Sequence, residues 1–450
     1  MKIGLLAMSG VRAKDEELLR LGLTLPGFVD RSKVIASLPS LGLLYIAAVT
    51  PPEHEVRYFE ALADGQEPQE IYSCDLVAIS SLSAQIYDAY AIAAKLRDHG
   101  VITALGGLHA SSVPHEAFNH VDHVIVGEGE NIWPKVVAAI EAKEEGRIWF
   151  AREAAPVCIE SLPPPRYDLL LGREYNRFTV QTSRGCPWRC DFCASSVMLR
   201  EKYRKRPIAN IVRDIQRIIE LFPRPFIEFA DDNTFVDKRW GKELCRALIP
   251  LNIKWFTETD ISVADDPELL ELMREAGCRQ VLIGLESPAQ EALVGLEQRT
   301  NFKARAFEHY RDSIHRIQSA GITVNGCFIL GLEEHTPAIF QQVLDFVNDV
   351  GLYEVQITVL TPFPGTPLYR RLSLENRLID ALDWQSCTLF DVNFVPKRMS
   401  PTQLRQGLYW LSERLYAKDS VNFRRRKFFQ HLRQPTTDVG LEIQGLKQAA

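Results

Sequence analysis

The chain has 450 residues, of which 46% are hydrophobic and 24% are charged, and its formal net charge is -6. This length predicts two or three domains, each with a core of its own. The composition is that of a globular protein, and the negative net charge gives no electrostatic reason to expect a nucleic-acid partner. The apolar stretches are too short to cross a bilayer, so we expect no membrane span.

Cysteines are spread unevenly along the chain. Of the nine, three lie within eight residues, at Cys186, Cys190 and Cys193, and the other six are scattered. An odd number with this spacing does not resemble a disulfide framework, so the sequence predicts a reducing, cytoplasmic compartment.

Residues 1–150 alternate between short apolar runs and helical stretches, the pattern of a parallel α/β sheet. Apolar runs buried on both faces predict a doubly wound sheet, whose ligands bind outside the carboxyl ends of the strands. The predicted strands are 2–7, 55–59, 76–80, 103–107 and 123–126, and the predicted helices are 41–49, 87–99 and 131–144.

Small or polar residues follow three of these predicted strands. Glycine lets the backbone approach a ligand closely, and hydroxyl groups donate hydrogen bonds to it. The candidate ligand contacts are Ser80, Ser81 and Ser83 after the third strand, Gly106, Gly107 and His109 after the fourth, and Gly127, Glu128 and Gly129 after the fifth. Each turn by itself also fits an ordinary strand-to-helix connection. His109 is either a polar contact in the crevice or a satisfied structural residue.

A linker is predicted at residues 151–175, because Pro163-Pro164-Pro165 continues neither a helix nor a central strand. A second α/β unit is then predicted over residues 176–375. Its strands are 179–182, 226–230, 253–257, 280–285, 323–330 and 355–360, with the clearest helices at 208–222 and 304–319.

The βα pattern stops after about residue 375, and residues 376–450 are predicted to be a small, mainly helical region. Ser400, Pro401 and Gln403 have the form of a helix start, with a serine N-cap, a proline at the first position and a glutamine that closes a capping box. We expect this region to cover the mouth of the second α/β unit.

The most specific motif is the C-x3-C-x2-C spacing of Cys186, Cys190 and Cys193, in a loop that contains Gly185 and Pro187. Three thiolates leave a 4Fe-4S cluster one protein ligand short, so one iron is open to an exogenous ligand. A zinc site is the alternative, but a second cysteine pair or two histidines at zinc spacing do not follow.

This spacing, with Phe192 before the last cysteine, resembles the signature of the radical S-adenosylmethionine (SAM) superfamily. The resemblance implies that the three cysteines hold a 4Fe-4S cluster whose open iron binds SAM, and that an electron from the cluster cleaves SAM to a 5′-deoxyadenosyl radical. The six βα repeats resemble the partial (β/α)6, TIM-like barrel of this family, in which the chemistry lies at the carboxyl ends of the strands.

The resemblance also implies which residues contact SAM. Carboxylates suit its ammonium group, although the turn after the second barrel strand also fits a surface turn. The implied contacts are Phe192, then Asp231, Asp232 and Asn233 after the second strand, Thr257, Glu258, Thr259 and Asp260 after the third, and Gly284, Glu286 and Ser287 after the fourth.

The three N-terminal turns, together with residues 38–48, resemble the Rossmann-like cobalamin-binding domain that precedes many radical SAM domains. Residues 361–369 are typical of the same branch. An Asp-x-His-x-x-Gly motif is missing from the sequence. The resemblance therefore implies either cobalamin bound without a protein histidine on cobalt or a scaffold that binds no cobalamin.

These resemblances imply an enzyme that abstracts hydrogen from an unactivated carbon of a small molecule or natural-product intermediate, with methyl transfer from cobalamin as the expected outcome. Radical dehydration, cyclisation or rearrangement without cobalamin is one alternative. A non-catalytic iron-sulfur sensor or electron carrier is another. The basic residues between Arg200 and Arg206 either are solvated or dock an electron donor such as flavodoxin or ferredoxin.

Overall fold

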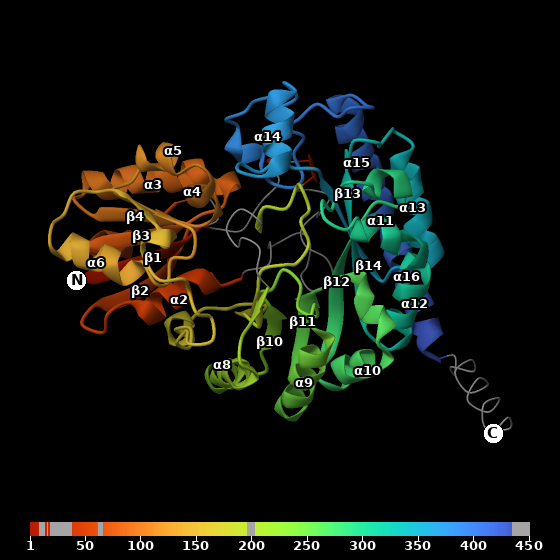
Figure 1. The fold of residues 1–450 in the computed structure, drawn as a ribbon, viewed down its shortest axis with the longest axis horizontal. Helices are drawn as coiled ribbons and strands as arrows, with labels where there is room; N and C mark the ends of the chain where they lie inside the picture. The colour runs from red at the N-terminus through yellow and green to blue at the C-terminus, as the bar shows by residue number, and fades with distance from the viewer. Residues whose placement is uncertain (9–13, 16, 19–37, 62–65, 196–202, 434–450) are drawn as a thin grey trace.

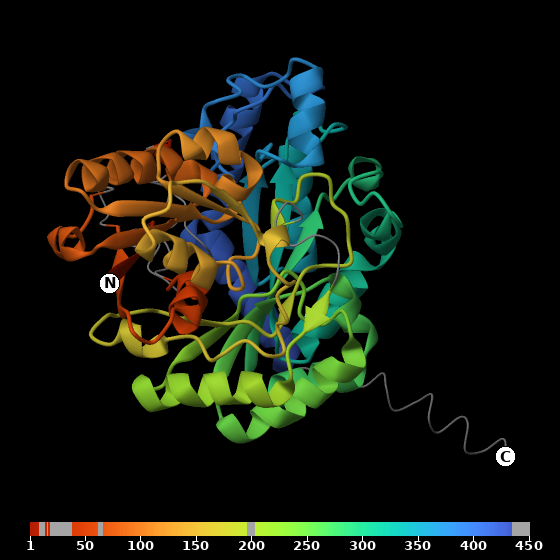
Figure 2. The same cartoon turned by 60° about the vertical axis from the view of Figure 1, so that its left-hand side comes forward.

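The computed structural model describes residues 1–8, 14–15, 17–18, 38–61, 66–195 and 203–433. Two six-stranded sheets account for most of the strands. Figure 1 shows the first sheet with its helices on the left and the second on the right, and Figure 2 shows the same two units from another side.

The first sheet has the strand order β2-β1-β3-β4-β5-β6, and all neighbouring strands are parallel. The order reverses between β1 and β3, which is the point where doubly wound sheets bind ligands. The predicted doubly wound fold is therefore confirmed. The strands are β1 (Lys2–Ala7), β2 (Glu55–Glu60), β3 (Leu76–Ser80), β4 (Ile102–Gly106), β5 (His123–Val126) and β6 (Ile148–Phe150). The sequence did not predict β6.

Helices cover both faces of this sheet (Figure 1). One face packs against α2 (Leu41–Val49) and α6 (Trp133–Glu141). The other face packs against α3 (Ile86–Asp98), α4 (Leu108–Ser112) and α5 (Pro114–Phe118). The two short helices α4 and α5 were not predicted.

The second sheet has the order β14-β13-β12-β11-β10-β7. Each of its strands is parallel to the strand of this sheet that follows it in sequence. β7 and β14 are the edge strands, which makes the barrel partial, as predicted. The strands are β7 (Phe178–Val180), β10 (Phe226–Phe229), β11 (Lys254–Glu258), β12 (Cys278–Glu286), β13 (Thr323–Leu330) and β14 (Glu354–Val359).

Amphipathic helices pack on the outside of this partial barrel (Figures 1 and 2). They are α8 (Ile208–Leu221), α9 (Lys238–Leu248), α10 (Pro267–Glu275), α11 (Phe302–Ala306), α12 (Tyr310–Ser319) and α13 (Ile339–Val350). The helix predicted over 304–319 is thus divided into α11 and α12, with a 3-10 turn at Phe307–His309 between them. A separate antiparallel pair, β8 (Ser183–Arg184) and β9 (Arg204–Lys205), lies on either side of the cysteine motif in sequence.

After β14 come α14 (Pro367–Leu374), at the end of the second unit, and then α15 (Pro401–Tyr416) and α16 (Lys418–Arg433) in the C-terminal region. The predicted capping box at the start of α15 is confirmed: Gln403 N–H donates to Ser400 Oγ at 3.1 Å, and Ser400 N–H donates to Gln403 Oε1 at 2.8 Å. α14 begins beside the cysteine motif, because Leu368 N–H donates to the carbonyl of Asp191 at 3.0 Å.

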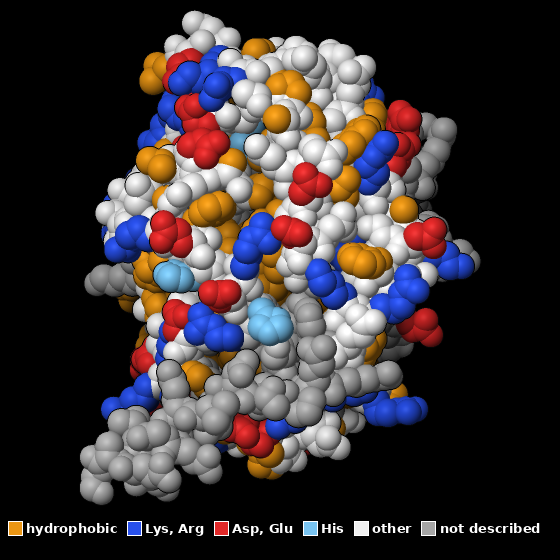
Figure 3. Space-filling model, turned by 90° about the vertical axis from the view of Figure 1, so that its right-hand side faces the viewer, with side chains coloured by type: hydrophobic (Ala, Val, Ile, Leu, Met, Phe, Trp, Pro, Cys, Tyr) orange, Lys and Arg blue, Asp and Glu red, His pale blue; other side chains and the backbone are white. Residues whose placement is uncertain are grey.

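On the face over the barrel helices, acidic and basic side chains are interspersed with apolar ones (Figure 3). Among the helices within the described ranges, none combines the length and the apolar character that a bilayer span requires.

We expect Gly407→Ala in α15 to destabilise the protein, although alanine normally favours a helix. A Cβ at Gly407 would lie 1.9 Å from Cζ of Phe340 in α13. Overpacking of this kind costs about 1–3 kcal/mol. The matched control is Gly42→Ala in α2, where a Cβ meets nothing within 4 Å. The control should gain about 0.5–1 kcal/mol. Urea unfolding of both variants tests this, and equal stabilisation would contradict it.

Candidate active site

The loop that carries Cys186, Cys190 and Cys193 is anchored to the segment that follows β12. Asp191 N–H donates to the carbonyl of Leu296 at 3.1 Å, and Gln298 N–H donates to the carbonyl of Arg189 at 2.9 Å. Cys190 and Glu297 form an isolated antiparallel bridge between the same two segments. The loop is therefore held at its middle as well as at its ends.

Glu297 fixes this anchor by accepting several hydrogen bonds. The donors are the N–H groups of Arg189 at 3.2 Å, Arg299 at 2.9 Å and Thr300 at 2.7 Å, and the Thr300 hydroxyl at 2.7 Å. Burial by itself raises the pKa of Glu297, but these hydrogen bonds outweigh it and lower the pKa to about 2. Glu297 is thus a carboxylate near neutral pH.

The three cysteines are half-buried thiols. Burial raises the pKa of Cys186 to about 12 and also raises that of Cys190, and the neighbouring thiols add to both shifts. Because burial holds the pKa values of Cys186 and Cys190 well above neutral pH, these two thiols must release protons when they bind iron. Within the described part of the chain, no three His, Cys, Asp or Glu side chains converge tightly enough for one metal ion. The thiolates of a cubane bind separate irons, so this donor set fits a 4Fe-4S cluster with one open iron.

Asp231 supports the loop from beneath. Its buried carboxylate accepts hydrogen bonds from Thr182 N–H at 2.8 Å, Ser183 N–H at 2.9 Å and the Thr234 hydroxyl at 2.9 Å, and also from the Thr182 hydroxyl. Thr257 is fully buried against Thr234. Among the predicted SAM contacts, Asp231 and Thr257 thus have their polar atoms engaged inside the protein.

Asn233, Thr259 and Asp260 join the ends of β10 and β11. Asn233 Nδ2 donates to Asp260 Oδ2 at 2.9 Å, and the Thr259 hydroxyl donates to Asn233 Oδ1 at 3.3 Å. Trp188 from the cysteine loop donates to Asp260 Oδ2 at 3.0 Å and stacks on Phe302 with ring centroids 4.3 Å apart. Trp188 is a site residue that the sequence analysis did not assign, although it lies between two of the cysteines.

Lys303 in α11 is a second unassigned residue, and its side chain reaches the end of β12. It donates to Glu286 at 2.6 Å and to the carbonyl of Gly284 at 2.8 Å. Gly284 leaves room for this ion pair, because a Cβ there would lie 2.4 Å from Oε1 of Glu286. Ser287 is hydrogen-bonded to His335 at 3.0 Å. No sequence motif around Lys303 pointed to it.

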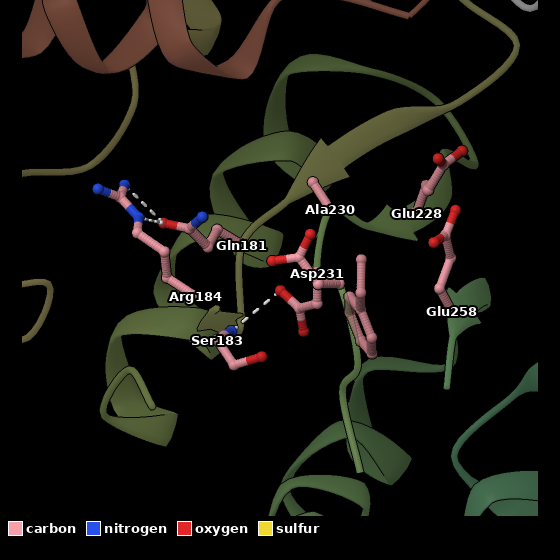
Figure 4. Close-up of a pocket in the computed structure, with 9 residues that line it drawn as sticks. Gln181, Ser183, Arg184, Glu228, Ala230, Asp231 and Glu258 are labelled. Atoms are coloured by element: carbon pink, nitrogen blue, oxygen red, sulfur yellow. Dashed lines mark hydrogen bonds between the residues drawn. The ribbon is translucent and has the colours of Figure 1, made fainter. Parts of the chain in front are cut away.

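A cavity of about 240 Å³ opens beside the cysteine loop at the ends of β7, β10 and β11. Figure 4 shows the side chains around it, with the carboxylates of Glu228 and Glu258 on one side and Asp231 between them and Ser183. The lining residues are Gln181, Ser183, Arg184, Glu228, Phe229, Ala230, Asp231, Asp232 and Glu258. Four of the nine are carboxylates, so the cavity favours a cationic ligand.

Glu258 has the most perturbed carboxyl of the cavity. Desolvation by the surrounding protein, followed by the nearby carboxylates of Glu228, Asp232 and Asp231, raises its pKa to about 8, although the residue stays exposed at the cavity. Glu228 is paired with Arg177 at 2.6 Å. With its pKa raised to about 8, Glu258 is largely protonated near neutral pH.

The three N-terminal turns lie at the carboxyl edge of the first sheet. Gly107 and Gly127 have φ values of 105° and 90°, which glycine adopts readily. A Cβ at Gly107 would lie 2.8 Å from the carbonyl oxygen of Ser81, so the turns after β3 and β4 touch through their backbones. Ser80, Gly106 and Gly129 lie along the same edge.

His109 is completely buried between the turns and the C-terminal region. Its ring nitrogens are hydrogen-bonded to Ser83 at 3.0 Å and to Glu116 at 3.2 Å, and Trp384 packs edge-on against the ring at 5.3 Å. Of the two roles considered for His109, this environment matches the satisfied structural residue.

Ion pairs join the turn after β5 to the cysteine loop. Arg184, two residues before Cys186, donates to Glu128 at 2.9 Å and to Glu130 at 2.7 Å. Arg204 in β9 donates to Glu128 as well. The sequence analysis assigned no role to Arg184, and it gave Glu128 a role in cobalamin binding.

The basic residues after the loop are engaged inside the chain wherever the structure describes them. Arg204 pairs with Glu128, Lys205 pairs with Asp237, and Arg206 pairs with Asp214 at 2.7 Å, where both side chains are completely buried. The expected solvation is therefore wrong for Arg206, whereas the Arg204 and Lys205 side chains remain 28% and 36% exposed. Arg200 and Lys202 lie outside the described residues.

Three family models match the chain in order. The B12-binding domain matches residues 29–137, the radical SAM superfamily matches residues 180–347, and a domain of unknown function (DUF4070) matches residues 366–447. The chain is 31% identical over 368 residues to an uncharacterized methyltransferase of Synechocystis sp., an alignment that covers 80% of this chain and 68% of that protein. The chain belongs to the radical SAM superfamily.

Further relatives agree with this assignment. The chain is 24% identical to the bacteriochlorophyllide d C-12(1)-methyltransferase of Chlorobaculum tepidum, over 85% of this chain and 83% of that protein. The structure of TsrM, a radical SAM methyltransferase from Kitasatospora setae with cobalamin and a 4Fe-4S cluster bound, matches with a TM-score of 0.65 at 15% identity, over 91% of this chain and 88% of TsrM. At that identity the match shows a shared fold.

The predicted family and the prediction of an enzyme are thus confirmed. The radical SAM match gives a 4Fe-4S cluster and SAM as cofactors, and the B12-binding match supports cobalamin as a third. The acidic cavity agrees with SAM, which carries a sulfonium and an ammonium group. A non-catalytic sensor or electron carrier has no support from these matches.

We expect Cys186→Ala, Cys190→Ala and Cys193→Ala each to lose the iron-sulfur absorbance and the cleavage of SAM. The physical reason is that two thiolates leave a second iron without a protein ligand. Absorbance after anaerobic reconstitution and assay of 5′-deoxyadenosine measure both losses. Cys245→Ala, at a buried cysteine in α9, is the control and should keep both. Wild-type cleavage in all three loop variants would contradict the assignment.

Glu258→Gln should stabilise the protein without SAM at high pH and have little effect at low pH. Unfolded glutamate titrates near pH ~4.3, whereas the folded pKa of Glu258 is raised to about 8. The folded state therefore binds the extra proton between these values, so stability falls as pH rises through this window and stays lower above it. Melting temperatures at about pH 5 and about pH 9 test this, with Glu53→Gln on an exposed turn as the control. Equal shifts at both pH values would contradict it.

Proposed function

We propose that this radical SAM enzyme transfers a methyl group from cobalamin to an unactivated carbon of a small molecule or natural-product intermediate. One observation carries the proposal: Arg184, two residues before the cluster cysteines begin, is bound to the turn that follows β5 of the B12-binding domain. Ligands of doubly wound sheets and of βα barrels both bind at the carboxyl ends of the strands. The two cofactor-bearing edges therefore face a common space.

In this proposal, some residues of the barrel bind the cluster and SAM, and others hold the strand ends in place. Cys186, Cys190 and Cys193 hold the cluster, and Asp232 and Glu258 offer carboxylates to the cationic groups of SAM. Glu286 is already paired with Lys303 and holds the end of β12 in place. Asp231, Asn233, Thr257, Thr259, Asp260 and Ser287 hold the strand ends in place through their hydrogen bonds. When bound, the cluster and SAM supply the hydrogen-abstracting 5′-deoxyadenosyl radical, and cobalamin supplies the methyl group.

The N-terminal turns receive the corrin in this proposal. The turns contain four glycines, whose backbone the corrin can approach closely because they lack a Cβ. They are Gly106, Gly107, Gly127 and Gly129, and Ser80 and Ser81 lie beside them. Ser83 and His109 support the turns from inside. The functional units that we propose are residues 1–150 for cobalamin, 151–175 as linker, 176–375 for the cluster and SAM, and 376–450 as the cover of the barrel mouth.

We further propose a reducing cytoplasmic setting and a one-electron donor such as flavodoxin or ferredoxin. None of the nine cysteines forms a disulfide, which suits a reducing compartment. Reductive cleavage of SAM consumes one electron that the chain itself does not generate, so a redox partner must deliver it.

The test is anaerobic reconstitution with iron, sulfide and hydroxocobalamin, followed by an absorbance spectrum and a corrinoid assay on the desalted protein. We expect stoichiometric cobalamin beside the cluster, and transfer of the methyl group of labelled methylcobalamin to a product once the substrate is found. Iron without cobalamin would contradict methyl transfer. That result would favour radical dehydration, cyclisation or rearrangement, with the N-terminal domain as a scaffold.

A matched pair of glycine variants separates the two cofactors. Gly107→Ala should lose cobalamin and keep the cluster, because its Cβ would lie 2.8 Å from the Ser81 carbonyl at the proposed corrin edge. Gly100→Ala shares the positive φ, at 78°, but meets nothing within 4 Å and lies between α3 and β4, away from that edge. It should keep both cofactors. Equal cobalamin content in the two variants would argue against this edge.

A further inference from the structure

We propose that Arg184 is a positioning residue that links the two cofactor sites. Assembly of the cluster then tightens the binding of cobalamin, and bound cobalamin stabilises the cluster to the same degree. We use the name junction for Arg184, Arg204, Glu128 and Glu130. The inference rests on the proposed binding of cobalamin at the first sheet, but it does not depend on methyl transfer.

The junction is a buried, balanced group of charges. The Arg184 guanidinium is forked, with Nη1 2.9 Å from Glu128 and Nη2 2.7 Å from Glu130. The exposed fractions of the Arg184, Glu128 and Glu130 side chains are 7%, 18% and 9%. Two arginines therefore face two carboxylates in a region from which water is largely excluded. Arg184 thus bridges two carboxylates, while Arg204 holds both oxygens of Glu128 in a bidentate contact, which fixes geometry as well as adding energy.

On the barrel side, Arg184 cannot move without the cluster loop. Its backbone pairs with Arg204 across β8 and β9, and the preceding residue, Ser183, donates its N–H to the buried Asp231 at 2.9 Å. The first cluster cysteine, Cys186, follows two residues later. The Arg184 guanidinium also donates to Gln181 Oε1 at 2.9 Å, so a residue on the barrel side helps to orient the Arg184 side chain.

On the other side, Glu128 and Glu130 belong to a short turn with little freedom. Gly127 begins it with a φ of 90° and donates its N–H to Ser111 at 2.9 Å. The carbonyl of Gly129 accepts from Ile132 at 3.2 Å and Trp133 at 2.9 Å, where α6 begins. A shift of either carboxylate therefore shifts the backbone of Gly127 and Gly129, which we propose to meet the corrin.

The charge balance gives the direction of the effect. Without Arg184, two largely buried carboxylates would share Arg204, which is bonded to Glu128 and to the carbonyl of Val157 but to Glu130 in no described contact. Removing one partner of a buried ion pair leaves an uncompensated charge, so the turn would move away from the cluster loop. Since a ligand shifts an equilibrium only through its different affinity for the two arrangements, and such coupling is reciprocal, each cofactor favours the arrangement that suits the other.

The experiment measures the dissociation constant of hydroxocobalamin anaerobically, for protein without iron and for protein with the reconstituted cluster and SAM. In the wild type we expect cobalamin to bind about tenfold more tightly with the cluster. In Arg184→Gln this ratio should fall to near one. Arg184→Lys should keep part of it, because lysine keeps the charge but not the fork. An unchanged ratio in Arg184→Gln, or a wild-type ratio of one, overturns the proposal.

Glu130→Gln tests the junction from the other side, since Glu130 was not expected to contact cobalamin. It should lower the ratio while leaving the absorbance of the cluster unchanged. Arg246→Gln, which removes an exposed pair with Glu268, is the control and should keep the wild-type ratio. If Arg184→Gln does not fold, as judged by circular dichroism, the double variant with Glu130→Gln takes its place. That double variant restores the charge balance without restoring the link.

Hydrogen exchange gives a second readout that needs no cobalamin. Assembly of the cluster should slow amide exchange in residues 126–132 of the wild type and leave it unchanged in Arg184→Gln. Unchanged exchange in the wild type overturns the link. A preserved ratio without methyl transfer would overturn only the proposed function, whereas a wild type that binds no cobalamin would overturn both.

Discussion

A buried carboxylate, Asp231, is the contact on which the cluster site depends. It accepts the N–H groups of Thr182 and Ser183 as the chain leaves β7, and the Thr234 hydroxyl binds it from the other side. Burial raises the pKa of Asp231, while these hydrogen bonds offset part of that cost. Leaving such buried donors without an acceptor costs about 1–3 kcal/mol each. The ligand loop and the junction both start from the backbone that Asp231 holds.

The interior of the barrel shows why this scaffold suits a cationic cosubstrate. Around the cavity, the carboxylates outnumber the cations near them, and Arg177 is already bound to Glu228. Desolvation by the surrounding protein, followed by repulsion from the neighbouring carboxylates, raises the pKa of Glu258 and keeps its proton near neutral pH. A ligand with a sulfonium and an ammonium group removes this repulsion. This acidic lining therefore favours SAM over a neutral ligand.

Much of the fold could be predicted because its signals are local. β3 and β13 are apolar runs buried on both faces, and their predicted bounds, 76–80 and 323–330, agree with the structure. β6 has three residues, too few to show a periodicity, and it is recognisable only by its pairing with β5. The helices α4 and α5 were not predicted for the same reason, since five residues are also too few to show a periodicity. Trp188 and Lys303 act through partners that are distant in sequence, and no local pattern encodes such partners.

In the turn after β5, the sequence predicts the backbone conformation of Gly127 but not the role of Glu128. The positive φ of Gly127 follows from backbone sterics, so a glycine at a strand end gives a sound expectation about conformation. The role of Glu128 depends on what lies opposite its carboxylate, and here that is Arg184, 56 residues further along the chain. An acidic residue in a ligand-binding turn can face the ligand or a neighbouring domain, and the sequence of the turn is the same in both cases. Here the carboxylate joins two cofactor-binding units.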